Sequence, residues 1–277
     1  MNRSEPPLVF LAWEEDPAAM NIAGNVLRLC GGVTMDRGTS SLAGVDLRWQ
    51  GKEIQLTYVK RSPLYLRGDE LGFDPRAIVV LSKHRSEAEI PCLTIHCTGN
   101  IGEAAYGGEP RKVSIAPASM MRAALLELYH GARRAALPYS VSYEVTHHGP
   151  TLDFPVMFVE VGSSERNWSD PLAGEAAARA ALAAALAYEE KMEVTIGLGG
   201  PHYAPLFTSR TITDGACFGH MVSWHQLPDF DEGSLAMVVG RNVGHFAGAA
   251  LDWKGLKKDR RRIVSILEKA HVPYVRI

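Results

Sequence analysis

Short apolar runs alternate with longer helical patterns along the first half of the chain. The run LVFLAW at 8–13 is uncharged, and the segment PAAMNIAGNVLRLC at 17–30 that follows it has a helical pattern. Runs rich in Val, Ile and aromatic residues predict three further strands, at 54–60, 77–82 and 92–97. Strands that alternate with helices predict an α/β fold, in which helices cover a largely parallel sheet.

Two helices in the middle of the chain carry start signals. The segment 116–135 predicts a helix with Ser114 as its N-cap and Pro117 in its first turn. The Ala-rich segment 171–190 opens on Asp170 followed by proline, which is a strong start signal. The remaining predicted elements are strands at 139–147, 155–161 and 191–199 and a basic helix at 255–270.

No internal repeat, low-complexity linker or charge block divides the sequence. We therefore expect residues 1–277 to form a single domain, an α/β three-layer architecture with a mixed, largely parallel sheet. The composition, 46% apolar and 22% charged, is that of an ordinary globular protein. The formal net charge of −2 provides no overall attraction to nucleic acid or membrane, so any such contact requires a local patch.

The apolar stretches are too short for targeting or membrane insertion. The run at 8–13 lies between prolines and acids, which indicates a strand rather than a signal peptide. The stretch 180–188 is far shorter than the ~20 residues of a membrane span. The four cysteines lie far apart without a CxxC pair, as is typical of reduced thiols. We expect a cytoplasmic monomer that does not contact a membrane.

Histidines follow several predicted strands, at the carboxyl ends where open α/β sheets bind ligands. The stretch 81–100 places Lys83 and His84 after one strand and His96 near the end of the next. We assign Lys83 and His84 to substrate binding, although a solvated cation in a loop would also explain His84.

The stretch 196–205 leaves its strand through Gly199 and Gly200 and then reaches His202. Glycines allow a ligand to approach the backbone closely, and their amides are candidates for binding an oxyanion. Formation of a turn would explain the same glycines. We assign Gly199 and Gly200 to substrate binding and His202 to catalysis.

Two adjacent histidines lie where the chain turns between two predicted strands. If strand alternation continues through 144–148, Thr146 and His148 share one face and His147 points to the other. One histidine would then be a packed structural group, while His148 would face the substrate. A change of His148 to Ala is expected to lower turnover and to leave binding nearly intact.

Glu160 lies among apolar neighbours in PVMFVEVG, where a carboxylate is costly unless it is paired. It is either a structural acid that holds a backbone amide or a general base or histidine partner, and we favour the second role. The candidate catalytic residues are therefore His148, Glu160, Thr146 and His202.

Several familiar catalytic motifs are absent from the sequence. It contains no GxSxG, HExxH, GxGxxG or P-loop, which disfavours serine hydrolysis, phosphoryl transfer from nucleotides and Rossmann hydride transfer. Histidines with carboxylates and hydroxyls suit the activation of water, either by a general base or by a metal ion. The spacing of these residues identifies no complete metal site.

The run KGLKKDRRR at 254–262 holds six Lys or Arg residues. A solvated outer face explains such a run, and contact with nucleic-acid phosphates is the more specific alternative. The candidate phosphate ligands are Lys254, Lys257, Arg260, Arg261 and Arg262.

Four stretches together resemble the archaeal and plant type of D-aminoacyl-tRNA deacylase. They are DPAAMNI at 16–22, SKHRSEAEIPCLTIHCTGN at 82–100, EVTHHGPTLDFPVMFVEVGSSERNW at 144–168 and IGLGGPHYAPLFT at 196–208. The resemblance implies a fold similar to the phosphorylase/hydrolase α/β group. It also implies hydrolysis of the ester between a D-amino acid and tRNA, as a proofreading or detoxifying step of translation.

Zinc is implied by the same resemblance, and we take His96, His148 and His202 as its candidate ligands. The expected partner is tRNA charged with a D-amino acid. Two alternatives stay open: a zinc-assisted amidase or phosphorylase-like enzyme of the same fold, and a non-catalytic tRNA-binding module.

Overall fold

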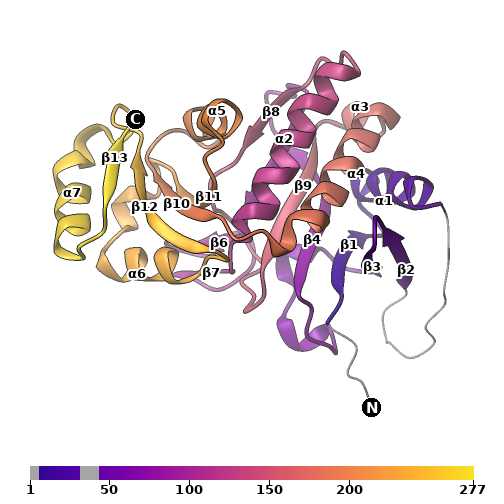
Figure 1. Cartoon of the computed structure of the whole chain (residues 1–277), viewed down its shortest axis with the longest axis horizontal. Helices are drawn as coiled ribbons and strands as arrows, with labels where there is room; N and C mark the ends of the chain where they lie inside the picture. The colour runs from indigo at the N-terminus through magenta and orange to yellow at the C-terminus, as the bar shows by residue number, and fades with distance from the viewer. Residues whose placement is uncertain (1–5, 32–43) are drawn as a thin grey trace.

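The structure is a computed structural model that describes residues 6–31 and 44–277. Within these residues the main sheet has seven strands in the order β2-β3-β1-β4-β9-β5-β8 (Figure 1). Most neighbouring strands are parallel, and the pairs β2–β3 and β5–β9 are antiparallel. The bounds are β1 (Leu8–Trp13), β2 (Gly44–Trp49), β3 (Lys52–Val59), β4 (Ala77–Arg85), β5 (Cys92–Cys97), β8 (Ser140–Tyr143) and β9 (Val156–Ser163).

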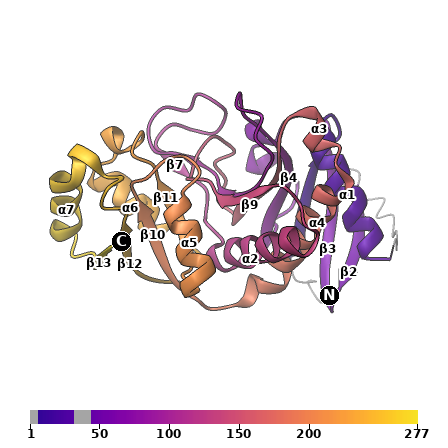
Figure 2. The same ribbon diagram turned by 90° about the horizontal axis from the view of Figure 1, so that it is seen from above.

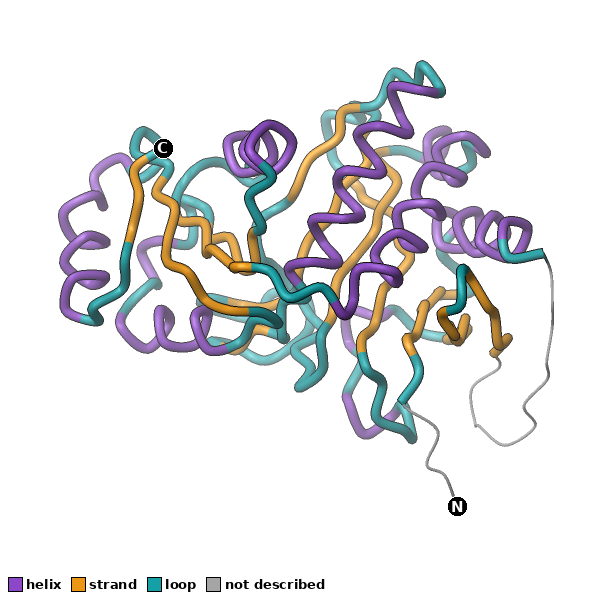
Figure 3. The backbone as a smooth tube through the Cα atoms, in the orientation of Figure 1, coloured by secondary structure: helices purple, strands orange, loops and turns teal. Residues whose placement is uncertain are grey.

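A second sheet of four parallel strands lies beside the first, in the order β11-β10-β12-β13 within the described chain. The C-terminus follows the last of these strands (Figure 3). The bounds are β10 (Glu193–Leu198), β11 (Phe218–Val222), β12 (His245–Leu251) and β13 (Tyr274–Arg276). A small antiparallel pair is formed by β6 (Gly99–Asn100) and β7 (Lys112–Val113).

Three helices, α1, α2 and α4, pack against one face of the main sheet, and Figure 2 shows α2 and α4 on one side of β4 and β9. Loops and short 3-10 segments cover the apolar residues of the other face. The helices are α1 (Pro17–Leu29), α2 (Ala118–Arg134), α3 (Glu165–Trp168), α4 (Pro171–Leu186), α5 (Pro205–Asp214), α6 (Glu232–Gly240) and α7 (Arg260–Lys269).

Helix α4 is buried on nearly all sides, because its alanines allow α1 and α2 to approach closely. Asp170 caps its first turn by accepting hydrogen bonds from the amides of Leu172 and Ala173. Asn21 of α1 donates to the carbonyl of Asp170, and a Cβ at Gly174 would lie only 2.2 Å from the Asn21 Oδ1. The glycine is therefore required by the contact between the two helices.

The second sheet is also covered on both faces. Residues of α6 and α7 pack with β10, β11 and β12 in one apolar cluster. On the opposite face, Phe207 of α5 and Phe218 of β11 belong to the same cluster as the core of the main sheet. The cores of the two sheets are thus continuous, which fixes the loops that run between them.

The predicted α/β class and the mixed, largely parallel sheet are confirmed, with the strands divided between two sheets. The strand predicted at 8–13 and the cap at Asp170 are also confirmed. The strand predicted at 139–147 ends earlier, at Tyr143. No prediction covered β2, β11, β12, α5 or α6. The single domain remains a prediction.

Other properties of the described chain agree with the sequence. All four cysteines are free thiols. None of the helices in the described ranges has the length and apolar character needed to cross a bilayer.

The prediction that Ser114 caps α2 is wrong, because α2 begins after Pro117 without a side-chain cap. The buried hydroxyl of Ser114 instead donates to the Pro150 carbonyl and accepts from the amide of Leu152, at 2.9 Å each. It also bonds Thr98 on the segment after β5. Ser114 therefore holds the loop that follows residues 147 and 148.

Replacement of Ser114 by Ala is expected to lower the free energy of unfolding by about 1–3 kcal/mol, because the buried Leu152 amide loses its acceptor. Urea unfolding of the metal-free protein measures the change. Ser119→Ala is the matched control, since that buried hydroxyl has no hydrogen-bond partner within the described ranges and its loss should cost little. Equal destabilisation by the two substitutions would contradict this role of Ser114.

Candidate active site

Histidines and glutamates from both sheets meet at one place between the sheets. Strands β4, β5 and β9 of the main sheet contribute three of them, the segment after β8 contributes three, and the loop after β10 contributes one. Most of them line a cavity of about 1090 Å³. The seven residues, called here the His–Glu centre, are His84, His96, Glu144, His147, His148, Glu160 and His202.

Glu144 is fully buried and joins three of these histidines. Its Oε2 accepts a hydrogen bond of 2.7 Å from Nε2 of His202 and lies 3.5 Å from Nε2 of His147. Its Oε1 lies 3.2 Å from Nδ1 of His84. Burial alone would raise the pKa of Glu144, but His202 and His84 hold it well below its usual value. The carboxylate is therefore ionised although it is shielded from water.

Glu160 is the second buried carboxylate, with Oε2 3.5 Å from His84 Nδ1 and 3.6 Å from His96 Nε2. Burial opposes its ionisation, but these two histidines lower the pKa of Glu160 to about 2. Burial alone would lower the pKa of His84, yet Glu144 and Glu160 raise it to about 12. His84 is thus a cation between two carboxylates, and its Nε2 bonds the Tyr203 hydroxyl at 2.8 Å.

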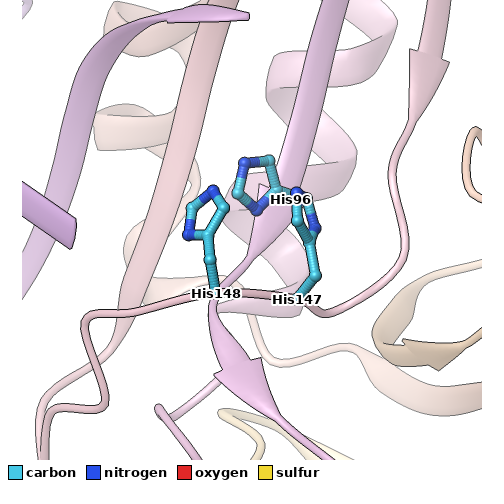
Figure 4. Close-up of side chains that lie close together, drawn as sticks. All are labelled: His96, His147 and His148. Atoms are coloured by element: carbon cyan, nitrogen blue, oxygen red, sulfur yellow. The ribbon is translucent and has the colours of Figure 1, made fainter. Parts of the chain in front are cut away.

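His96, His147 and His148 form a second part of the centre, with ring centroids 4.3 to 5.0 Å apart (Figure 4). Nδ1 of His147 donates to the Val145 carbonyl and Nδ1 of His148 donates to the Gly149 carbonyl, each at 2.6 Å. This tautomer leaves the lone pair of each Nε2 available. The buried Nε2 of His96 has no hydrogen-bond partner among the residues that the structure describes.

Two of these three histidines are in the charge state that suits binding of a cation. Burial and the neighbouring His96 lower the pKa of His148 to about 4, and burial also lowers that of His147 well below its usual value. Both are neutral near pH 7, which is the form that binds a metal. Burial opposes protonation of His96, but Glu160 raises its pKa, so a bound metal would displace a proton there.

The described residues contain three groups whose donor atoms lie within 4.8 Å of one another. One is His96, His147 and His148, and the others are centred on Glu144. The sequence-based set of His96, His148 and His202 is not among the three, because His202 bonds Glu144 instead. His147 takes its place beside His96 and His148.

The expected alternation through 144–148 is wrong. The strand ends at Tyr143, and His148 adopts a φ of 35°, so both His147 and His148 point into the His–Glu centre. Thr146 points elsewhere: its hydroxyl bonds Nδ1 of His220 at 3.0 Å and accepts from the amide of Met221. Thr146 therefore lies outside the group of catalytic candidates that the structure brings together.

Of the two amides expected to bind an oxyanion, at Gly199 and Gly200, the structure engages the first in a hydrogen bond. The Gly199 amide donates to the Val222 carbonyl at 2.8 Å and is not free to bind an oxyanion. Both residues have positive φ, and a Cβ at Gly200 would lie 2.8 Å from Oδ2 of Asp252. The close approach of neighbouring loops explains these glycines.

The remaining substrate-binding candidates fall in two places. Lys83 lines the same cavity as His84, and its ammonium lies 5.3 Å from the ring centroids of Trp13 and Trp168. Lys254, Lys257 and Arg260 to Arg262 lie instead around α7. Of these, Arg262 donates to the Leu227 and Phe230 carbonyls, which gives it a structural role.

Sequence reasoning did not select Glu144, His147 or Tyr203 as site residues. A glutamate three positions before a histidine, in a segment that also contains His148, was a signal for the first two. Tyr203 gave no signal, because its contact with His84 spans 119 positions of the chain.

The sequence is similar to proteins of one known family. A model of the D-aminoacyl-tRNA deacylase family matches residues 71–275. The D-aminoacyl-tRNA deacylase of Methanosarcina mazei is 34% identical over 97% of this chain and 91% of its own length. That of Pyrococcus horikoshii is 36% identical over 72% of this chain and 73% of its own. The chain belongs to the D-aminoacyl-tRNA deacylase family.

Solved structures were compared as well. The crystal structure of a conserved protein of unknown function, AF0625, matches with a TM-score of 0.86 and 27% identity over 99% of this chain and 96% of that chain. Futalosine hydrolase of Helicobacter pylori matches with a TM-score of 0.42 and 10% identity over 65% of this chain and 97% of that chain.

The depressed pKa of His148 predicts a loss of stability in acid. Folded His148 takes up a proton only near pH 4, whereas the unfolded residue does so near its ordinary value of 6.5. The contribution to stability is therefore present above pH 6.5 and is lost as the pH falls through 4.

His148→Asn removes this titration and tolerates the positive φ. Between pH 7 and 4, the free energy of unfolding of the metal-free variant should fall by about 1–3 kcal/mol less than that of the wild type. Urea unfolding at several pH values measures both slopes, and identical slopes would contradict the assignment.

Proposed function

We propose that this protein hydrolyses the ester between a D-amino acid and the 3′ end of tRNA, as a proofreading step of translation. Membership of the family supports the substrate, and the His–Glu centre supports the chemistry. The observation that carries the mechanism is the hydrogen bond of 2.7 Å between the buried Glu144 and His202, which lines the cavity.

His202 is the proposed general base. Glu144 accepts a hydrogen bond from Nε2–H of His202, which fixes the tautomer. The lone pair on Nδ1 of His202 is then free to accept a proton from water. The water oxygen attacks the ester carbonyl, and the adjacent carboxylate stabilises the imidazolium that forms. The proton then passes to the 3′ oxygen as the ester bond breaks, which yields free amino acid and tRNA.

Tyr203 is the proposed stabiliser of the oxyanion. Nε2–H of the His84 cation donates a hydrogen bond to the Tyr203 hydroxyl oxygen. The hydroxyl hydrogen of Tyr203 is then available for a hydrogen bond to the substrate. A donor held in place before the reaction stabilises the negative charge that develops on the carbonyl oxygen. Lys83 lines the cavity together with His84 and His202, which supports a role in contacting the phosphate of the terminal nucleotide.

We further propose that His96, His147 and His148 hold a zinc ion. The unpartnered Nε2 of His96 and the neutral tautomers of the other two are the features that zinc requires of histidine ligands. Bound zinc would supply a Lewis acid that lowers the pKa of water. Glu160 lies 3.6 Å from His96 Nε2, so a carboxylate is available beside this group.

The direct test is release of amino acid from tRNA charged with D-tyrosine and, separately, with L-tyrosine. With protein present, the D-ester should be lost rapidly. The L-ester should be lost no faster with protein than without it. If folded, zinc-replete protein cleaved neither ester, the proposed function would be wrong and a non-catalytic tRNA-binding role would replace it. Activity on nucleosides with phosphate would instead favour a phosphorylase-like enzyme.

Variants of the same protein separate the two proposed roles of histidine. His147→Ala should abolish stoichiometric zinc, whereas His202→Ala should retain zinc and lose about 100-fold or more in kcat. His130→Ala, an exposed histidine of α2, is the matched control and should change neither zinc content nor kcat. Zinc lost from His202→Ala but retained by His147→Ala would restore the sequence-based ligand set.

A further inference from the structure

Two tryptophans mark the carboxyl ends of the second sheet. Trp224 lies just after β11, Trp253 lies just after β12, and Arg276 is the last residue of β13. Because β10 to β13 are parallel, the segments that follow these strands gather at one edge of the sheet, which is where open α/β sheets bind ligands. The edge consists of Trp224, His225, Trp253, Lys257, Arg260 and Arg276 and is called here the tryptophan edge.

The cations of the tryptophan edge are positioned by aromatic rings. The Lys257 ammonium lies 3.0 Å from the centroid of the Trp224 ring. The guanidinium carbons of Arg276 and Arg260 lie 4.1 Å and 5.4 Å from the centroid of Trp253. None of these three cations forms an ion pair with a carboxylate of the described residues. A ring holds a cation in place without cancelling its charge, so the edge keeps a positive potential.

Backbone contacts connect the tryptophan edge to the His–Glu centre. The Trp224 amide donates to the carbonyl of Gly200, two residues before His202. Two residues after Trp224, the side chain of Gln226 donates to the carbonyl of Thr146, next to His147. Trp224 therefore lies beside the loop that carries His202 and the segment that carries His147.

We propose that the tryptophan edge binds the single-stranded nucleotides that precede the aminoacylated adenosine of tRNA, an inference that rests on the proposed function. Phosphates would contact Lys257, Arg260 and Arg276. The exposed ring of His225, tilted by 31° to the Trp224 ring with centroids 3.4 Å apart, would contact an unpaired base. Aromatic rings favour a single strand over a duplex, whose bases are already stacked.

The charge of the protein agrees with a local contact of this kind. The net charge of −2 provides no general attraction to RNA, so phosphate binding depends on cations that are gathered in one place. The proposal also refines the role of the basic run at 254–262. Lys257 and Arg260 belong to the edge, where Nε of Arg260 also donates to the Trp253 carbonyl at 2.6 Å. Arg262 is held instead by the Leu227 and Phe230 carbonyls and by Asp259.

Steady-state kinetics on two substrates test the proposal. One is full-length tRNA charged with D-tyrosine, and the other is the minimal ester D-tyrosyl-adenosine, which lacks the preceding nucleotides. For Lys257→Ala and Trp224→Ala, the loss of kcat/KM on tRNA should exceed the loss on the minimal ester roughly tenfold. Trp224→Phe, which keeps an aromatic ring beneath Lys257, should recover most of the difference.

A salt titration and a control on the adjacent helix α7 sharpen the experiment. The slope of log(kcat/KM) for tRNA against log salt should fall by about 0.7 in Lys257→Ala, as expected for one lost contact with a single strand. Lys269→Ala also removes a lysine of the α7 region, but Lys269 is ion-paired with Glu232. That variant should match the wild type on both substrates.

Two results would overturn the proposal. One is equal loss on tRNA and minimal ester, which would show a structural effect on the His–Glu centre, and the other is no loss on tRNA. If the wild type cleaves neither substrate, the proposed function fails. Binding of uncharged tRNA then tests the tryptophan edge independently of catalysis. Weaker binding by Lys257→Ala would support the edge, whereas equal binding, or equal affinity for tRNA without its 3′ single strand, would refute it.

Discussion

The buried carboxylate of Glu144 is the interaction on which the rest of the site depends. An ionised carboxylate without access to water is tolerated only when cationic or hydrogen-bonding partners surround it, and here the partners are imidazoles. His84 comes from the main sheet, while His202 comes from the loop that leaves the second sheet. Glu144 therefore fixes the position of the two sheets relative to each other at the place where the cavity opens.

The two carboxylates divide the histidines into distinct chemical states. His84, between Glu144 and Glu160, is held as a cation, whereas His147 and His148 are held neutral by burial and by neighbouring imidazoles. One cluster thus combines a fixed positive charge with neutral nitrogen donors. Both can assist hydrolysis of an ester, since the attacking water loses a proton while the carbonyl oxygen gains negative charge.

The sequence predicted the elements whose apolar pattern is strong, such as the strand at 8–13 and the capped helix that follows Asp170. It did not predict β11 and β12, because FGHMV and HFAGAAL contain glycines and small residues in place of a clear strand pattern. The pairing of Glu160 with histidines followed from the cost of burying its charge. The sequence did not predict that His147 lies beside His96. Strand alternation was assumed to continue beyond Tyr143, where the backbone leaves the strand. Contacts between distant loops, such as Tyr203 with His84, leave no trace in local spacing.

Single-turnover hydrolysis of D-tyrosyl-tRNA by Glu144→Gln tests whether the histidines of the site depend on the buried charge of Glu144. Glutamine has nearly the same shape, but it carries no charge with which to stabilise the imidazolium of His202 or the cation of His84. The variant should fold, and its rate should be lower by about 10- to 100-fold. A rate equal to that of the wild type would contradict this prediction, because the histidines would then work without the buried charge.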